Sequence, residues 1–162
     1  MTQTIEQLTI ALGTKLKQRK WKLVTAESCT GGGLAYFVTQ IAGSSEWFER
    51  GFVTYSNEAK CELLGVKTGT LEQFGAVSEQ TAREMAEGAL HNSQSQISIA
   101  ITGIAGPGGG TLEKPVGTVW FGWAGLHAAT GTHLEVFSGD RQTVREKSIY
   151  AALEQLLRFL SL

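Results

Sequence analysis

The sequence is poor in the residues that mark several classes of protein. It holds two cysteines, Cys29 and Cys61, among 162 residues, which is too few for a disulfide-stabilised secreted scaffold. Its three histidines are scattered and neither a CxxC pair nor an HExxH motif occurs, so we expect no metal site. No apolar run approaches membrane length, and residues 1–7 lack the pattern of a signal peptide. These absences predict a cytoplasmic protein with no membrane partner.

Charge of either sign is also scarce. Charged residues make up 18% of the chain, and 14 basic residues against 15 acidic ones leave a net charge of −1. Because there is no basic stripe, we expect no nucleic-acid partner, and an anionic ligand would need a local cluster or backbone amides. The length and the apolar content of 42% indicate one globular domain over residues 1–162.

Hydrophobic periodicity outlines the order of the secondary structure. It predicts helices over residues 3–19 and 33–41, a short helix capped by Ser56 or Asn57, a helix capped by Ser78 and a last helix capped by Asp140. Strands are expected at residues 21–26, 52–55, 97–101, 116–123 and 132–137, the last two as a hairpin, with connecting structure over residues 65–75. This order predicts a three-layer α/β domain with a mixed, mostly parallel sheet of about five strands.

Ser28 stands between a predicted strand and a predicted helix and is followed by Gly31, Gly32 and Gly33. The first free N–H groups of that helix would point at whatever the serine attacks, which is the arrangement that acyl transfer needs. In the alternative, the glycines only allow a tight turn and Ser28 helps to cap the helix. Cys29 is either a rival nucleophile, since a thiol near a helix N-terminus can have a lowered pKa, or a small buried filler.

Lys60 is the candidate base for such a serine, because no histidine falls in a segment typical of an active-site loop. It lies in the first turn of the short predicted helix, where the helix macrodipole and burial would both lower its pKa. A neutral lysine can accept a proton, and Ser–Lys pairs are a known variant of triad chemistry. Tyr55 would then relay a proton or orient the lysine. In the alternative, Lys60 pairs with Glu58 or Glu62 on a solvated face and Tyr55 covers the core.

A glycine-rich loop over residues 102–110 follows the strand predicted at residues 97–101 and exposes backbone amides. It matches neither GxxxxGK[ST] nor GxGxxG, so it predicts either a general ligand cradle or a flexible turn. Lys114 is near enough in the sequence to reach into such a cradle. Arg141 and Arg145, at the start of the last helix, suit either a phosphate clamp or a solvated face.

The tryptophans bear on assembly. Trp47, Trp120 and Trp123 are expected in the core or at an interface rather than stacked on nucleic-acid bases. An interface role would make the protein a homodimer or a higher homo-oligomer, which we state as an expectation.

Taken together, these segments resemble the CinA C-terminal domain family. The matching runs follow one another over nearly the whole chain, which makes the resemblance far more specific than a single glycine-rich loop. They are residues 25–32 (TAESCTGG), 41–45 (IAGSS), 51–60 (GFVTYSNEAK), 75–78 (GAVS), 102–107 (TGIAGP), 114–119 (KPVGTV) and 138–141 (SGDR).

The resemblance implies a three-layer α/β/α fold with a mixed sheet, and it implies an activity. The expected reaction is hydrolysis of the carboxamide of nicotinamide mononucleotide to nicotinate mononucleotide and ammonia, in pyridine nucleotide recycling. Ser28 is the implied nucleophile, Lys60 the base and Tyr55 an assisting residue, and no cofactor is implied. Longer family members carry an N-terminal domain with a separate hydrolase activity. We expect that activity to be absent, because this chain has no room for the domain.

The expected binding residues surround this Ser–Lys pair. Backbone N–H groups at Thr30, Gly31 and Gly32 are expected to hold the oxyanion. The remaining expected substrate contacts, with the ribose phosphate along the glycine-rich loop, are Asn57, Thr102, Gly103, Ala105, Gly106, Lys114 and Arg141. Two other interpretations stay open: a non-catalytic nucleotide-binding or regulatory module that uses the same pocket, and a thiol amidase that uses Cys29.

Overall fold

Helices and strands follow one another in the order that the hydrophobic periodicity predicts. The computed structural model describes residues 2–161. Its elements are α1 (Ile5–Arg19), β1 (Leu23–Glu27), α2 (Gly33–Thr39), the 3-10 turn η1 (Ser44–Glu46), β2 (Phe48–Val53), α3 (Asn57–Leu64), α4 (Thr68–Phe74), α5 (Glu79–His91), β3 (Ile97–Gly103), β4 (Thr118–Gly125), β5 (Gly131–Val136) and α6 (Arg141–Leu160). The caps predicted at Ser78 and Asp140 are confirmed, and Ser56 rather than Asn57 caps α3.

Across residues 2–161 the strands form one sheet of five, in the order β2-β1-β3-β4-β5. Strand β1 pairs in parallel with β2 and with β3, whereas β4 is antiparallel to both β3 and β5. Strand β5 therefore runs in the same direction as β1, β2 and β3, and β4 is reversed between them. The prediction of a mixed, mostly parallel sheet whose last two strands form a hairpin is confirmed.

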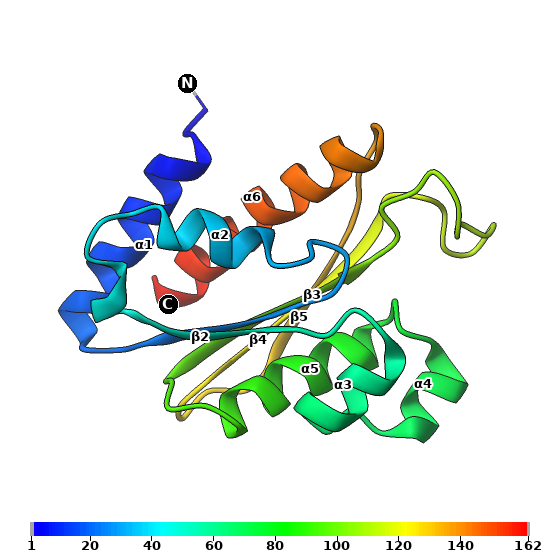
Figure 1. The fold of residues 1–162 in the computed structure, drawn as a ribbon, viewed down its shortest axis with the longest axis horizontal. Helices are drawn as coiled ribbons and strands as arrows, with labels where there is room; N and C mark the ends of the chain where they lie inside the picture. The colour runs from blue at the N-terminus through cyan, green and yellow to red at the C-terminus, as the bar shows by residue number, and fades with distance from the viewer. Residues whose placement is uncertain (1, 162) are drawn as a thin grey trace.

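Helices cover both faces of this sheet (Figure 1). Helices α1, α2 and α6 lie on one face, and α3, α4 and α5 lie on the other. The first face buries a core that includes Leu12, Phe121 and Leu156, and the second buries a smaller core that includes Met85 and Ala100. The arrangement is the three-layer α/β/α sandwich that the resemblance implies. Across residues 2–161, no helix combines the length and the apolar character needed to cross a lipid bilayer.

Most strand boundaries shift by one or two residues from the sequence prediction, and two differences are larger. Residues 65–75, expected as connecting structure, contain the seven-residue helix α4, which has no side-chain cap and no buried residue among those described. Because it lacks a buried face, α4 carries no apolar periodicity, which is the signal that predicts the other helices. Strand β2 starts at Phe48 and ends at Val53, so Tyr55 lies beyond the strand, in the loop that leads to α3.

The carboxyl ends of β1 and β3 meet where the chain changes faces. After β1 the chain crosses through α2 to β2, and after β2 it crosses on the opposite face through α3, α4 and α5 to β3 (Figure 1). A crevice opens outside the strand ends at such a point, and ligands of α/β sheets bind there. Glu27, the last residue of β1, pairs with Ile101 of β3 and Val53 of β2. Ser28 follows Glu27 directly, so the fold delivers this hydroxyl to the crevice.

Candidate active site

Ser28 and Lys60 meet at the end of β1, although 32 residues separate them in the sequence. The Ser28 N–H donates to Ile101 O at 3.0 Å, which extends the β1–β3 pairing by one residue and fixes the serine backbone. Lys60 reaches the serine from α3, and its Nζ lies 3.0 Å from Ser28 Oγ. The same Nζ donates to Thr54 O at 2.8 Å and to Tyr55 O at 3.1 Å.

The surroundings of Lys60 favour its neutral form. Its side chain is 1% exposed, and burial lowers the pKa of its amine below the ordinary value, because the charged form loses its hydration. A neutral amine has two N–H donors and one lone pair. In the neutral amine, the carbonyls of Thr54 and Tyr55 can accept its two hydrogens, which would leave the lone pair for the Ser28 hydroxyl. The alternative in which Lys60 pairs with Glu58 or Glu62 in solvent is wrong for this structure.

A cleft of about 330 Å³ opens above the pair. The glycine-rich loop forms one wall, and the residue pair before α5 forms another. The lining residues are Ser28, Cys29, Tyr55, Lys60, Ala76, Val77, Thr102, Gly103, Ile104, Ala105, Gly106, Gly108, Gly109 and Arg141. The structure therefore brings together the predicted nucleophile and base with five of the expected binding residues, namely Thr102, Gly103, Ala105, Gly106 and Arg141.

The mouth of the cleft is polar and cationic. Arg141, from the start of α6, donates from Nη1 to Gly106 O at 2.7 Å and has its Nη2 3.4 Å from the Tyr55 hydroxyl. The Tyr55 side chain is 64% exposed, and its hydroxyl contacts Arg141, whereas its backbone carbonyl accepts from Lys60. Tyr55 thus orients Lys60 through the main chain and Arg141 through the phenol.

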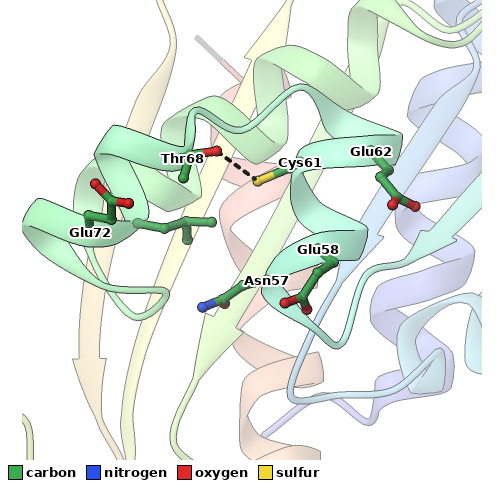
Figure 2. Close-up of a pocket in the computed structure, with 7 residues that line it drawn as sticks. Asn57, Glu58, Cys61, Glu62, Thr68 and Glu72 are labelled. Carbon is green, nitrogen blue, oxygen red and sulfur yellow. Dashed lines mark hydrogen bonds between the residues drawn. The ribbon is translucent and has the colours of Figure 1, made fainter.

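Asn57 and Lys114 lie away from this cleft. Asn57 lines a separate cavity between α3 and α4, which Figure 2 shows. The ammonium of Lys114 donates to Phe74 O at 2.6 Å, and this bond connects the chain just after the glycine-rich loop to the last residue of α4. The structure thus does not support the expectation that either residue contacts a ligand held at Ser28.

The N-terminus of α2 is closed by the chain itself. The Glu27 side chain, 1% exposed, accepts from the N–H groups of Leu34 and Ala35 at 2.9 and 3.1 Å. It also accepts from Thr30 Oγ1 at 2.6 Å. The other N–H groups of the first helical turn donate to carbonyls of the preceding turn. The expectation that free N–H groups of this helix face the substrate is therefore wrong, because a buried carboxylate already binds them.

The turn between Ser28 and α2 holds the three expected oxyanion donors. The Gly31 N–H donates to Ser28 O at 3.1 Å, so it is committed to the turn and is no longer a candidate. The N–H groups of Thr30 and Gly32 have no acceptor among the hydrogen bonds of residues 2–161. Of these residues, Thr30 is fully buried and follows Cys29, which lines the cleft.

Cys29 does not have the environment of a reactive thiol. It is 6% exposed, and burial raises the pKa of its thiol to about 12. The reactive species of cysteine is the thiolate, which such a pKa makes rare near neutral pH. Within residues 2–161, no group of three or more His, Cys, Asp or Glu side chains is arranged to hold a metal ion.

Sequence reasoning missed part of this site. Ala76 and Val77 line the cleft but were not among the expected binding residues; their apolar side chains carry no chemical signal, and only the matching run 75–78 could have pointed to them. The role of Glu27 could have been inferred, because a carboxylate at the end of a buried strand needs donors, and a helix N-terminus supplies them. Arg145 bonds the Cys29 and Thr30 carbonyls rather than the cleft mouth, unlike either role predicted for it.

Known proteins are similar to this sequence over nearly its whole length. The family model of the CinA C-terminal domain matches residues 5–160. The chain belongs to the CinA C-terminal domain family. Among its CinA relatives, nicotinamide-nucleotide amidohydrolase PncC of Enterobacter agglomerans is 53% identical over 95% of this chain and 94% of its own length. The protein of the same name from Escherichia coli K12 is 54% identical over 93% of this chain and 91% of its own length.

A solved structure of the CinA family shares the fold. The crystal structure of competence/damage inducible protein CihA from Agrobacterium tumefaciens superposes with a TM-score of 0.94 at 44% sequence identity. The match covers 100% of both chains. The α/β/α architecture of this CinA domain is thus shared by an experimentally determined relative.

Proposed function

We propose that this CinA domain hydrolyses the carboxamide of nicotinamide mononucleotide to nicotinate mononucleotide and ammonia. Relatives at 53% and 54% identity bear the name nicotinamide-nucleotide amidohydrolase. The observation that carries the mechanistic part of the proposal is the 3.0 Å contact between Ser28 Oγ and the buried Nζ of Lys60. A desolvated amine beside a hydroxyl, on the floor of a cleft, is the arrangement that activates a serine nucleophile.

The first half of the reaction forms an acyl-enzyme. Neutral Lys60 takes the hydroxyl proton as Ser28 Oγ forms a bond to the amide carbon, and the carbonyl oxygen gains the negative charge. The N–H of Thr30 is the proposed donor to this oxyanion, with that of Gly32 as the second candidate. The C–N bond then breaks, and the Lys60 ammonium gives its proton to the nitrogen, which leaves as ammonia.

The second half releases the acid. Water attacks the acyl carbon, and Lys60 takes one of its protons. The bond from carbon to Ser28 Oγ breaks, and the serine oxygen regains a proton from Lys60. One amide and one water thus become one carboxylic acid and one ammonia, which ionise to carboxylate and ammonium. The enzyme returns to its starting state with no cofactor consumed.

The ribose phosphate is proposed to lie along the glycine-rich loop, with Arg141 as its charge partner. Arg141 is the arginine among the residues that line the cleft, and the planar fork of a guanidinium can donate to two phosphate oxygens at once. A cleft of about 330 Å³ falls within the range of small-ligand sites. Lys114 is left out of this proposal, because its ammonium is bound by Phe74 O.

Ser28→Ala tests the function directly. Purified wild-type protein is expected to release ammonia from nicotinamide mononucleotide, and the variant is expected to release almost none while it still binds the nucleotide by calorimetry. The binding should persist because the methyl group removes only the nucleophile from the cleft. Substantial turnover by the variant would refute the serine role. A wild-type protein that binds the nucleotide without releasing ammonia would identify a regulatory module instead.

The remaining expectations join this proposal. We propose a single amidohydrolase domain over residues 1–162, a role in pyridine nucleotide recycling and a homodimeric assembly. Trp47 is 1% exposed and belongs to the core, so an interface role for tryptophan now rests on the half-buried Trp120 and Trp123. Light scattering at several protein concentrations would test the assembly, and a monomer throughout would overturn that part.

A further inference from the structure

The guanidinium of Arg145 donates hydrogen bonds to the backbone of the turn that follows the proposed nucleophile. It reaches the turn from the first half of α6 and donates from Nε to Cys29 O at 3.1 Å and from Nη2 to Thr30 O at 3.2 Å. A planar fork that bonds two successive carbonyls holds two peptide planes at once. Arg141, one helical turn earlier, instead lies at the cleft mouth, so the two arginines differ in what they hold.

The two gripped carbonyls also determine where two N–H groups point. In a trans peptide the C=O and the following N–H lie in one plane and point in opposite directions. The Cys29 carbonyl shares its peptide with the Thr30 N–H, which therefore points away from Arg145. The Thr30 carbonyl shares its peptide with the Gly31 N–H, which donates to Ser28 O at 3.1 Å. Arg145 thus fixes one peptide that closes the turn and one whose N–H has no acceptor within residues 2–161.

The opposite side of the turn is fixed as well. Glu27 accepts from Thr30 Oγ1 at 2.6 Å, so the Thr30 side chain and the Thr30 backbone are held by groups of opposite charge. Gly31 has φ +59°, and a Cβ there would lie 3.3 Å from Arg145 Nη2. A side chain at this position would require the guanidinium to shift by a few tenths of an ångström, and the positive φ itself favours glycine.

We propose that Arg145 is a positioning residue for the amide hydrolysis, which holds the Cys29–Thr30 peptide so that the Thr30 N–H meets the oxyanion. Its charge also polarises that peptide, because a carbonyl that accepts from a cation makes the N–H of the same peptide a stronger donor. The inference rests on the proposed function. It differs from the phosphate clamp predicted from the sequence, in which Arg145 would bind the substrate itself.

Kinetics of Arg145→Ala separate the two roles. We expect kcat for nicotinamide mononucleotide to fall by about 10- to 100-fold, below the loss seen when an oxyanion donor is removed outright. The KM and the inhibition constant of ribose 5-phosphate should stay unchanged, because the ground state does not use the Thr30 N–H. Added guanidinium ion at a non-denaturing concentration should restore part of kcat in this variant. Arg141→Ala should show the opposite pattern: the KM and the inhibition constant of ribose 5-phosphate should rise, and kcat should change less.

Two further variants keep the result interpretable. Arg145→Lys keeps the charge but loses the fork, so its kcat should be lower than that of wild type and higher than that of Arg145→Ala. If the alanine variant fails to fold, the lowered kcat of the lysine variant still tests the role. Arg158→Gln removes an exposed guanidinium from the same helix and should leave kcat unchanged. Full kcat in either Arg145 variant, or a raised inhibition constant with kcat retained, would overturn the inference alone. Absence of ammonia release by wild type would overturn the proposed function and, with it, this inference.

Discussion

Two cavities are lined in part by residues of helix α3, and they have similar volumes but different reactive groups. One is the cleft of about 330 Å³ at Ser28, and the other is a cavity of about 380 Å³ between α3 and α4. Neighbouring residues of the helix serve them, since Lys60 lines the first and Cys61 the second. The proposed chemistry belongs to the first cavity alone, and the linings of the two cavities differ in ways that explain why.

The two cavities differ in whether their reactive side chains are buried and in whether those side chains point toward one another. In the cleft, the buried Lys60 amine and the Ser28 hydroxyl point at one another, and burial tunes the amine toward its reactive form. In the α3–α4 cavity, the carboxylates of Glu58, Glu62 and Glu72 are exposed and do not converge on one point, and Cys61 Sγ contacts Thr68 Oγ1 at 4.0 Å (Figure 2). Among the residues that line this cavity, no buried amine faces a hydroxyl as Lys60 faces Ser28.

The largest expected effect comes from exchanging one residue on each side of α3. Lys60→Met removes the base and should lower kcat by about 10²- to 10⁴-fold. Cys61→Ser changes a side chain of the other cavity and should leave kcat within about twofold, because Cys61 does not line the cleft and such a substitution changes the free energy of unfolding by no more than about 0.5 kcal/mol. The kcat of each variant is measured as ammonia release at saturating substrate, and circular dichroism verifies that each variant is folded. Equal losses in the two variants would mean that the contrast between the cavities is not a contrast in chemistry.

The contrast was only partly predictable from the sequence. The Ser56 cap, the helix it starts and the position of Lys60 within that helix follow from local patterns. That Lys60 points at Ser28 does not, because the contact joins the end of β1 to α3 across 32 residues; sequence reasoning left this pair as one of two alternatives, and the resemblance to the CinA family favoured it. Asn57, expected among the substrate contacts, lies three residues before Lys60. Three residues along a helix are nearly one turn, yet the two side chains line different cavities.

The surroundings of the nucleophile were predicted wrongly for a physical reason. A strand, a serine and three glycines before a helix predict free N–H groups at the helix start. Glu27, one residue beyond the strand predicted at residues 21–26, instead folds its side chain back and accepts from the N–H groups of Leu34 and Ala35. Because these partners lie only seven and eight residues further along the chain, the interaction could have been inferred from the unpaired donors of a helix N-terminus.

The pH dependence of the rate sharpens the comparison next. Only neutral Lys60 can take the serine proton, so kcat/KM should rise about tenfold per pH unit below the pKa of Lys60 and level off above it. Burial lowers that pKa from the ordinary 10.5, so the plateau should begin below pH 10.5. Cys61→Ser should keep the same profile. A rate that still climbs steeply above pH 10.5 would show that the pKa of the amine is not lowered in solution.

The same shift has a sign in stability. Between the lowered pKa of Lys60 and 10.5, the unfolded chain binds the proton that the folded protein has released. The free energy of unfolding should therefore rise with pH across that window, and this component should be absent in Lys60→Met. Urea melts of the two proteins at several pH values measure it, and parallel pH dependences would contradict the assignment.

The smallest expected effect concerns the two thiols, one in each cavity. Cys61 is half-buried in the α3–α4 cavity, whereas Cys29 is 6% exposed with its pKa raised to about 12. Iodoacetamide at neutral pH should therefore label Cys61 first, as peptide mass spectrometry would detect, and activity should change by less than about twofold because Cys61 lies outside the cleft. Cys61→Ser should then resist labelling under the same conditions. Rapid inactivation that tracks labelling of Cys29, together with activity retained in Ser28→Ala, would transfer the chemistry from the hydroxyl to the thiol. The proposed contrast predicts instead that the cleft thiol is the inert one, since the burial that lowers the pKa of the amine raises the pKa of the thiol.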